Sequence, residues 1–138
     1  PNVITSLEFE RLINAGGPTG GRLLRPSDLS IPDSVAFIQC VGSRGPEGLP
    51  ECSRYCCQAA IKQSIALREK GIQVTIFERD IRVYHHEAET MYRKARGMGV
   101  NFIRYKPGNE PKLIGEKNFC FNLVFVIIAC SEILRRLF

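Results

Sequence analysis

Residues 35–40 have the sequence VAFIQC, and this short run decides the fold of the chain. Its β-branched and aromatic side chains are typical of a buried strand. Residues 53–70 follow with helical spacing, and Gly71 supplies a stop signal after them. One stripe of this helix contains Cys57, Ala60, Ile61, Ser64 and Ile65. A buried strand followed by such a helix is the first half of a βαβ unit.

The same rhythm continues beyond Gly71. Residues 74–77 (VTIF) predict a second buried strand, residues 86–96 a second helix, and residues 100–105 (VNFIRY) a third strand. Strands that alternate with helices pair in parallel and are joined by right-handed crossovers. We therefore predict an α/β fold whose core is a three-stranded parallel, Rossmann-like sheet with the order βαβαβ.

A short helix and a linker precede this unit. Residues 4–16 predict the helix, with Thr5 and Glu8 as a capping box and Gly16 as a left-handed stop. The Gly-rich stretch at residues 16–21 follows a helix and ends in Arg22, so we interpret it as a linker and not as a phosphate loop. We expect residues 1–33 to form this helix and linker, and residues 34–115 to form the Rossmann-like domain.

Residues 116–138 differ from the rest of the chain. The run 119–130 is almost wholly apolar, but it is shorter than the about 20 residues that span a bilayer. We expect a buried strand or helix there. A frameshifted end is one hypothesis for this composition. In that case Cys120 and Cys130 are incidental thiols, and residues 1–115 fold alone.

Composition indicates a globular protein. The 138 residues are 44% hydrophobic and 24% charged, which is ordinary for one domain, or one domain plus a piece of another. The net charge of +5 comes from scattered basic residues and not from a run that would bind nucleic acid. No charged-then-apolar leader starts the chain, so we expect reduced thiols, a cytoplasmic location and no membrane partner.

Four of the six cysteines gather between residues 40 and 57, with the spacing C-x11-C-x3-C-C. Cys40 ends the first strand, whereas Cys52, Cys56 and Cys57 surround the start of the following helix. A dinucleotide-binding fold would place its glycine turn at this point. The glycines here do not match G-x-G-x-x-G, and Pro46 and Pro50 prevent a tight turn. We therefore expect thiols in place of a nucleotide at this edge of the sheet.

The carboxyl ends of parallel strands meet at one edge, where such sheets bind their ligands. Cys40, Glu78 and the loop 80–86 should line that edge. Glu78 stands where a ribose-binding acid would be, but without the partner glycines we expect it to be a solvated acid.

A four-iron cluster needs four thiolates that converge from different directions. Adjacent residues on a regular helix project about 100° apart, so Cys56 and Cys57 can both reach a cluster only from the first turn. Unpaired amides at the helix start can then donate to sulfur. Arg44 and Arg54 are candidates to add positive charge and tune the reduction potential.

Three other interpretations of these cysteines remain open. Zinc binds four thiolates, although its ligands usually come in C-x2-C pairs. Cys56 and Cys57 are candidates for a redox dithiol, although they lack the C-x-x-C spacing. The third interpretation is that the four thiols are buried without a ligand. The spacing favours the cluster over these alternatives.

The motif FIQCVGSR at residues 37–44, together with CSRYCC at residues 52–57, resembles the A subunit of heterodisulfide reductase. PNVITSLEFERL at residues 1–12 and GGPTGG at residues 16–21 resemble it too. The similarity covers about residues 1–106. Members of this family are iron–sulfur flavoproteins of methanogens and related anaerobes.

The resemblance implies that Cys40, Cys52, Cys56 and Cys57 ligate one [4Fe–4S] cluster near an FAD. It also implies electron partners such as hydrogenase, formate dehydrogenase or ferredoxin, and further heterodisulfide reductase subunits. The flavin-binding glycine motif and the ferredoxin-type cysteine runs of the family are absent from this chain. We therefore expect an electron-transfer module of an oxidoreductase, without a catalytic residue of its own. The alternatives are a zinc-stabilised interaction module and a fragment that is inactive alone.

Overall fold

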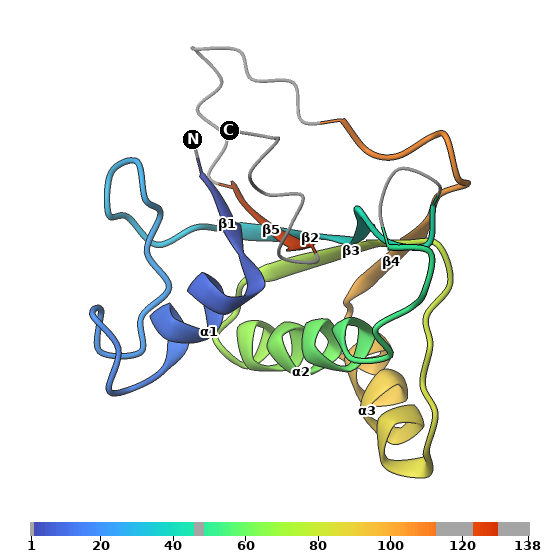
Figure 1. The fold of residues 1–138 in the computed structure, drawn as a ribbon. Coiled ribbons are helices and arrows are strands. Elements are labelled where there is room, and N and C mark those ends of the chain that lie inside the picture. The colour runs from blue at the N-terminus through green and yellow to red at the C-terminus, as the bar shows by residue number, and fades with distance from the viewer. Residues whose placement is uncertain (1, 46–48, 113–122, 130–138) are drawn as a thin grey trace.

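The computed structural model describes residues 2–45, 49–112 and 123–129, and it has an α/β fold (Figure 1). Five parallel strands form one sheet in the order β1-β5-β2-β3-β4. Their bounds are β1 (Val3–Thr5), β2 (Ser34–Val41), β3 (Gln73–Glu78), β4 (Asn101–Arg104) and β5 (Leu123–Ala129). The three predicted strands are β2, β3 and β4, and their parallel pairing confirms the predicted core.

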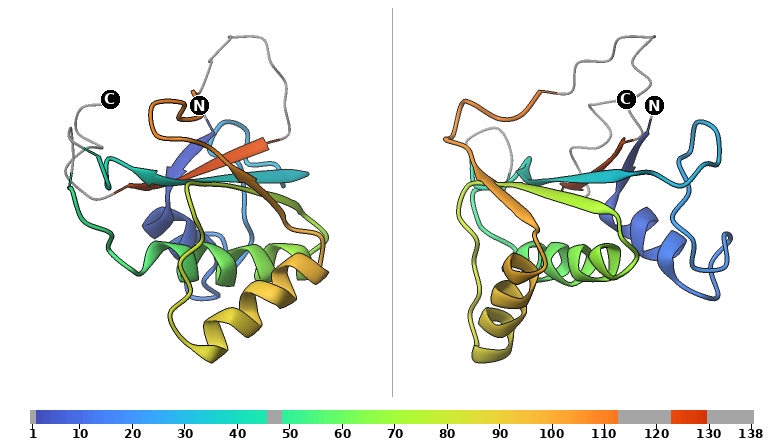
Figure 2. Two further views of the ribbon diagram at one scale, coloured as in Figure 1. Left: turned by 90° about the vertical axis from the view of Figure 1, so that its right-hand side faces the viewer. Right: turned by 180° about the vertical axis from the view of Figure 1, so that it is seen from behind.

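Helices α1 (Ser6–Ile13), α2 (Cys56–Glu69) and α3 (His86–Gly97) all lie on the same face of the sheet (Figures 1 and 2). The central helix is α2. It is tied to α1 by the Gln63 side-chain amide, which donates to Glu10 Oε1 at 2.9 Å, and to α3 by the ion pair of Glu69 with Lys94 at 3.0 Å. This position explains why residues on several sides of α2 are buried.

The hydrophobic core lies between these helices and the sheet. Phe9 of α1 and Phe37 of β2 are fully buried and meet edge to face, with ring centroids 5.6 Å apart. Ile61 of α2 and Ile76 of β3 are also fully buried. Full burial of one such side chain stabilises the fold by about 1.5–3 kcal/mol. The inner stripe predicted for α2 therefore packs where its periodicity indicates.

The ends of α1 confirm one prediction and correct another. The Glu8 amide donates to Thr5 Oγ1 at 3.2 Å and the Thr5 amide donates to Glu8 Oε2 at 2.6 Å, so the capping box is present. The prediction that Gly16 stops the helix is wrong, because α1 ends at Ile13. Asn14 already leaves helical geometry, and its Oδ1 accepts the Gly16 amide at 2.8 Å. By contrast, Gly71 and Gly99 follow α2 and α3 in the left-handed conformation, both with φ +81°.

The apolar run near the C-terminus contributes a strand. β5 lies between β1 and β2, and Val126 is in register with Ile4 on one side and Phe37 on the other. Of the two expected structures, strand and helix, the strand is therefore present. Cys120 and Cys130 lie outside the described residues, and the division of the chain at residues 33 and 115 stays a prediction. Within the described part of the chain, no helix is long and apolar enough to cross a membrane.

Candidate functional site

Strand β2 bends at Cys40. Its pairing with β3 extends only as far as Ile38, and its register against β5 shifts between Ile38 and Val41. Cys40 itself has a φ of +59°, in the left-handed region that non-glycine residues rarely occupy. Such backbone conformations persist only where surrounding contacts hold them, and they concentrate at functional sites. The bend places a buried thiol at the carboxyl edge of the sheet.

Cys56 and Cys57 are the first two residues of α2, in the first turn where the spacing argument expects them. Both are buried. The N-cap residue, Tyr55, makes no side-chain cap, and the amides of Cys56 and Cys57 donate to the Cys56 sulfur. Ser53 Oγ lies 3.3 Å from the same sulfur. The start of the helix therefore directs its unpaired donors at a thiol.

Cys52 lies in the loop before α2 and is half-buried. The backbone amide of Arg54 donates to its sulfur at 3.4 Å, and the Tyr84 hydroxyl lies 4.0 Å from it. The Arg54 guanidinium itself lies over the Tyr84 ring, 5.7 Å from the centroid. Arg54 thus contacts Cys52 through its backbone, whereas its charge is held above an aromatic ring.

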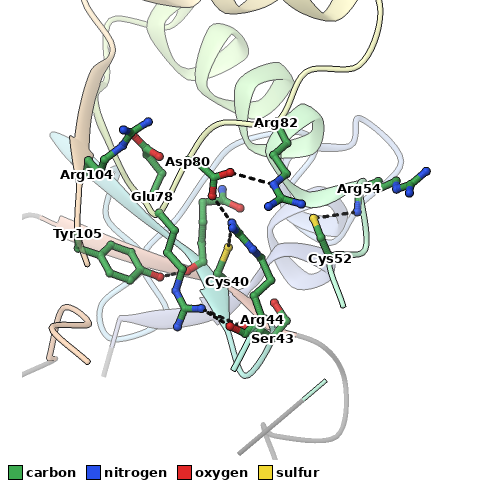
Figure 3. Close-up of polar contacts among 12 residues, drawn as sticks. Cys40, Ser43, Arg44, Cys52, Arg54, Glu78, Asp80, Arg82, Arg104 and Tyr105 are labelled. Carbon is green, nitrogen blue, oxygen red and sulfur yellow. Dashed lines mark hydrogen bonds and ion pairs between the residues drawn. The ribbon is translucent and has the colours of Figure 1, made fainter. Parts of the chain in front are cut away.

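Arg44 lies between a thiol and a carboxylate (Figure 3). Its Nη1 is 3.8 Å from Cys40 Sγ and also contacts Asp80 Oδ1. Asp80 Oδ2 in turn accepts from Arg82 Nε at 2.9 Å. The loop after β3 therefore lines the same edge as Cys40, as predicted. The roles of Asp80 and Arg82 were not predicted individually, although charged residues directly after a buried strand were a usable signal.

The four thiols do not share one electrostatic environment. Burial raises the pKa of Cys40, although the hydrogen bond from Arg44 opposes this. The contact between Cys56 and Cys57 lowers the pKa of Cys56 to about 6 and raises the pKa of Cys57. Charge interactions connect Cys40 with both Cys56 and Cys57. These three thiols are therefore close enough to influence one another's ionisation.

Cys52 is linked to the other cysteines through Arg82. The Arg82 amide donates to the Cys57 sulfur, and the Arg82 side chain interacts with the charge of Cys52. The loop after β3 thus contacts thiols from both the helix start and the preceding loop. Pairwise interactions thus connect each of the four predicted cysteines either with another of them or with Arg82 in the loop after β3.

Four cysteine thiolates are a donor set that iron–sulfur clusters and zinc both accept. All four cysteines are free thiols. In residues 2–45, 49–112 and 123–129, no three His, Cys, Asp or Glu side chains converge closely enough to hold one metal ion. Tetrahedral zinc would require thiolates about 2.3 Å from a common centre. A four-iron cluster binds its cysteines at different irons, so the sulfurs stand further apart.

Two polar residues near this edge, Glu78 and Gln39, are buried. Glu78 is only 6% exposed, so the prediction of a solvated acid is wrong. Burial raises its pKa, and Arg104 Nε lies 3.7 Å from its Oε1. Gln39, next to Cys40, is fully buried, and its side-chain amide has no hydrogen-bond partner among the described residues. A fully buried amide without a hydrogen-bond partner is rare in folded proteins.

Comparison with known proteins identifies relatives of this chain. No protein-family model matches it. The A subunit of ferredoxin:CoB-CoM heterodisulfide reductase of Methanosarcina mazei is 50% identical over 109 residues, which cover 77% of this chain and 14% of the relative. The second iron-sulfur A subunit of CoB–CoM heterodisulfide reductase of Methanopyrus kandleri is 49% identical over 110 residues, covering 77% of this chain and 17% of the relative.

A third relative is the A subunit of H(2):CoB-CoM heterodisulfide,ferredoxin reductase of Methanothermobacter marburgensis. It is 46% identical over 110 residues, again 77% of this chain and 17% of the relative. The chain therefore spans about one sixth of the length of the curated relatives it matches.

Proposed function

Since the matched part of this chain belongs to the family of heterodisulfide reductase A subunits, we propose that its four clustered cysteines hold one four-iron cluster that relays electrons. The ligands are Cys40, Cys52, Cys56 and Cys57. When bound, such a cluster supplies one-electron transfer at a potential set by its surroundings. The proposal is supported by four free cysteines that come from strand β2, the loop before α2 and the start of α2, and by the charge interactions that connect Cys40 with Cys56 and Cys57.

The protein groups around the thiols suit this role. Thiolates, and not thiols, bind iron, and the lowered pKa of Cys56 supplies one thiolate near neutral pH. Amides at the start of α2 and of Arg54 donate to sulfur, which offsets negative charge. The Arg44 guanidinium does the same beside Cys40. Burial of Cys40, Cys56 and Cys57 keeps water away from three of the four ligands.

Within a longer protein, this unit would act as an electron-transfer module. We propose that residues 34–115 carry the cluster and pass electrons between an FAD bound elsewhere in the polypeptide and further clusters. The names of the relatives include ferredoxin, H2, formate and F420H2, and the redox proteins that use these are the electron partners we propose. The chain needs no bond-making residue of its own for this role.

Anaerobic reconstitution of the full 138-residue chain with iron and sulfide tests the proposal. We expect about four irons and about four sulfides per chain and broad visible absorption from the brown protein. Substitution of Cys40, Cys52, Cys56 or Cys57 by Ser should each reduce the retained iron. Cys130→Ser is the matched control, because it also removes one thiol but lies outside the ligand set.

Two outcomes would contradict the cluster. The first is a colourless chain that binds stoichiometric zinc and no iron, which would indicate the zinc-stabilised module. The second is equal retention of iron and sulfide in Cys40→Ser and in Cys130→Ser, which would exclude Cys40 as a ligand.

A further inference from the structure

The main chain next to Cys40 does not pair with β3, so its carbonyl groups need hydrogen-bond donors other than that strand. Strand pairing with β3 ends at Ile38, so the carbonyl of Gln39 has no partner in that strand. It accepts a hydrogen bond from the Tyr105 hydroxyl. After the bend, the carbonyls of Ser43 and Arg44 accept from Arg79 Nη1 at 3.4 and 2.6 Å. Two side chains thus hold the main chain immediately before and shortly after Cys40.

Both side chains are themselves held firmly. Tyr105 follows β4 and is 8% exposed, and its backbone amide donates to the Glu78 carbonyl at 2.8 Å. Arg79 follows β3, and its side chain is 10% exposed. Its Nη2 lies 2.8 Å from Glu110 Oε1, and its guanidinium lies 5.9 Å from the centroid of the Tyr105 ring. We call this pair of residues the Arg79–Tyr105 clamp.

We propose that the Arg79–Tyr105 clamp positions the Cys40 thiol and, through the Arg44 carbonyl, the guanidinium that lies beside it. The inference rests on the proposed function, in which Cys40 is a cluster ligand. Both clamp residues hydrogen-bond to the main chain near Cys40, and the Arg79 charge also acts directly on the Cys40 thiol. The left-handed conformation of Cys40 needs such support, because an isolated strand end would relax to extended geometry.

The contacts of the Arg79–Tyr105 clamp depend on particular polar groups of the two side chains, so conservative substitutions can remove them. Tyr105→Phe keeps the ring under the guanidinium and removes only the hydroxyl that donates to Gln39. Arg79→Lys keeps a positive charge near Glu110 but loses the planar fork that reaches the loop carbonyls and Glu110 at the same time. Tyr92→Phe and Arg93→Lys make the same chemical changes on α3, where Tyr92 packs on Phe102 and Arg93 pairs with Glu89, and they serve as matched controls.

The first test uses the metal-free full chain. Its readout is the alkylation rate of each cysteine by iodoacetamide, mapped by mass spectrometry, alongside the urea midpoint of unfolding. We expect alkylation of Cys40 to accelerate on the order of tenfold in both clamp variants, with smaller changes at Cys57 and none in the controls. Equal acceleration at all four cysteines, in proportion to lost global stability, would overturn the positioning role.

The second test uses reconstituted protein. We expect both clamp variants to release iron to a chelator on the order of tenfold faster than the controls, and to shift the electron paramagnetic resonance spectrum of the reduced cluster. A spectrum and release rate identical to those of the controls would overturn the inference. If wild-type chain binds no iron, the cluster proposal fails. Unchanged Cys40 alkylation in the clamp variants refutes the clamp separately.

Discussion

Asp80, from the loop after β3, makes an ion pair with Arg44, from the loop after β2, and holds it against Cys40 near the end of β2. The Arg44 side chain is 19% exposed and that of Asp80 is 37% exposed, so the pair is only partly screened by water. Arg82 contacts the other carboxylate oxygen of Asp80. One acidic side chain therefore holds two arginines, one of which lies beside the Cys40 thiol.

Asp80→Asn should weaken the fold modestly. The substitution removes one charge from a carboxylate that accepts from two arginines, and its partial exposure limits the effect to about 1 kcal/mol of unfolding free energy. Urea unfolding of the metal-free chain measures this loss. Glu69→Gln, in an exposed ion pair with Lys94, is the control and should change stability by less than about 0.5 kcal/mol. A larger loss in the control than in Asp80→Asn would contradict the assigned role.

The same carboxylate makes stability depend on pH. Burial raises the pKa of Asp80, but hydrogen bonds from Arg44 and Arg82 outweigh it, so the pKa lies below the ordinary value of 3.8. Its contribution to stability is therefore fully present above the unfolded pKa and is lost as pH falls through the folded pKa. Glu78 lies near this group and its pKa is shifted upward, which gives a dependence of opposite sign.

We therefore expect wild-type chain to lose more stability than Asp80→Asn when pH falls from about 5 to about 3. Urea midpoints measured at several pH values in this window provide the comparison, and the difference between the two chains isolates Asp80 from other carboxylates. Parallel curves for the two chains would show that the arginines do not stabilise the charged form.

The acidity of Cys56 depends chiefly on its neighbour in the helix. The hydrogen bond from Cys57 is the largest cause of its lowered pKa of about 6, and Ser53 contributes less. In metal-free chain, Cys57→Ala should raise the pKa of Cys56 toward the ordinary value of 9.0, and Ser53→Ala should raise it by a smaller amount. The pH dependence of Cys56 alkylation reports this value. Cys130→Ala removes a thiol that is distant from Cys56 in the sequence and should leave the pKa of Cys56 unchanged, and a larger effect from Ser53→Ala would reverse the ranking.

Local patterns predicted much of this fold. The βαβαβ unit was predictable from local sequence. The runs at residues 35–40 and 74–77 each indicate a buried strand, and the stripe in α2 indicates the buried face of the helix. The place of β5 between β1 and β2 was not, because it depends on pairing between residues 122 positions apart on one side and 89 positions apart on the other. The sequence analysis did not predict β1, because a strand of three residues is too short to show an alternating pattern and its last residue, Thr5, is also the N-cap of α1.

Some features of the candidate site were likewise predictable from local sequence, and others were not. The cysteine positions relative to a strand end and a helix start were predictable, since both are local features. The contacts of Arg44 with Asp80 and of Tyr105 with Gln39 join residues 36 and 66 positions apart. They depend on which side chains the sheet order brings together. Arg54 was predicted to act through its charge, whereas its backbone amide makes the contact with Cys52.

The last strand should be necessary for the fold, in contrast to the hypothesis that residues 1–115 fold alone. β5 pairs with β1 on one side and with β2 on the other, so its backbone amides donate to both neighbours in turn. Val126→Pro removes one of these donors in the middle of the sheet and adds a ring that the strand cannot accommodate. We expect a loss of about 3 kcal/mol or more in unfolding free energy, measured by urea unfolding of the metal-free chain. Val126→Thr is the control, because it keeps the amide and the β-branched shape, and it should cost clearly less than the proline. If both variants match wild type, residues 123–129 are dispensable, and the apolar run is an appendage and not a strand of this sheet.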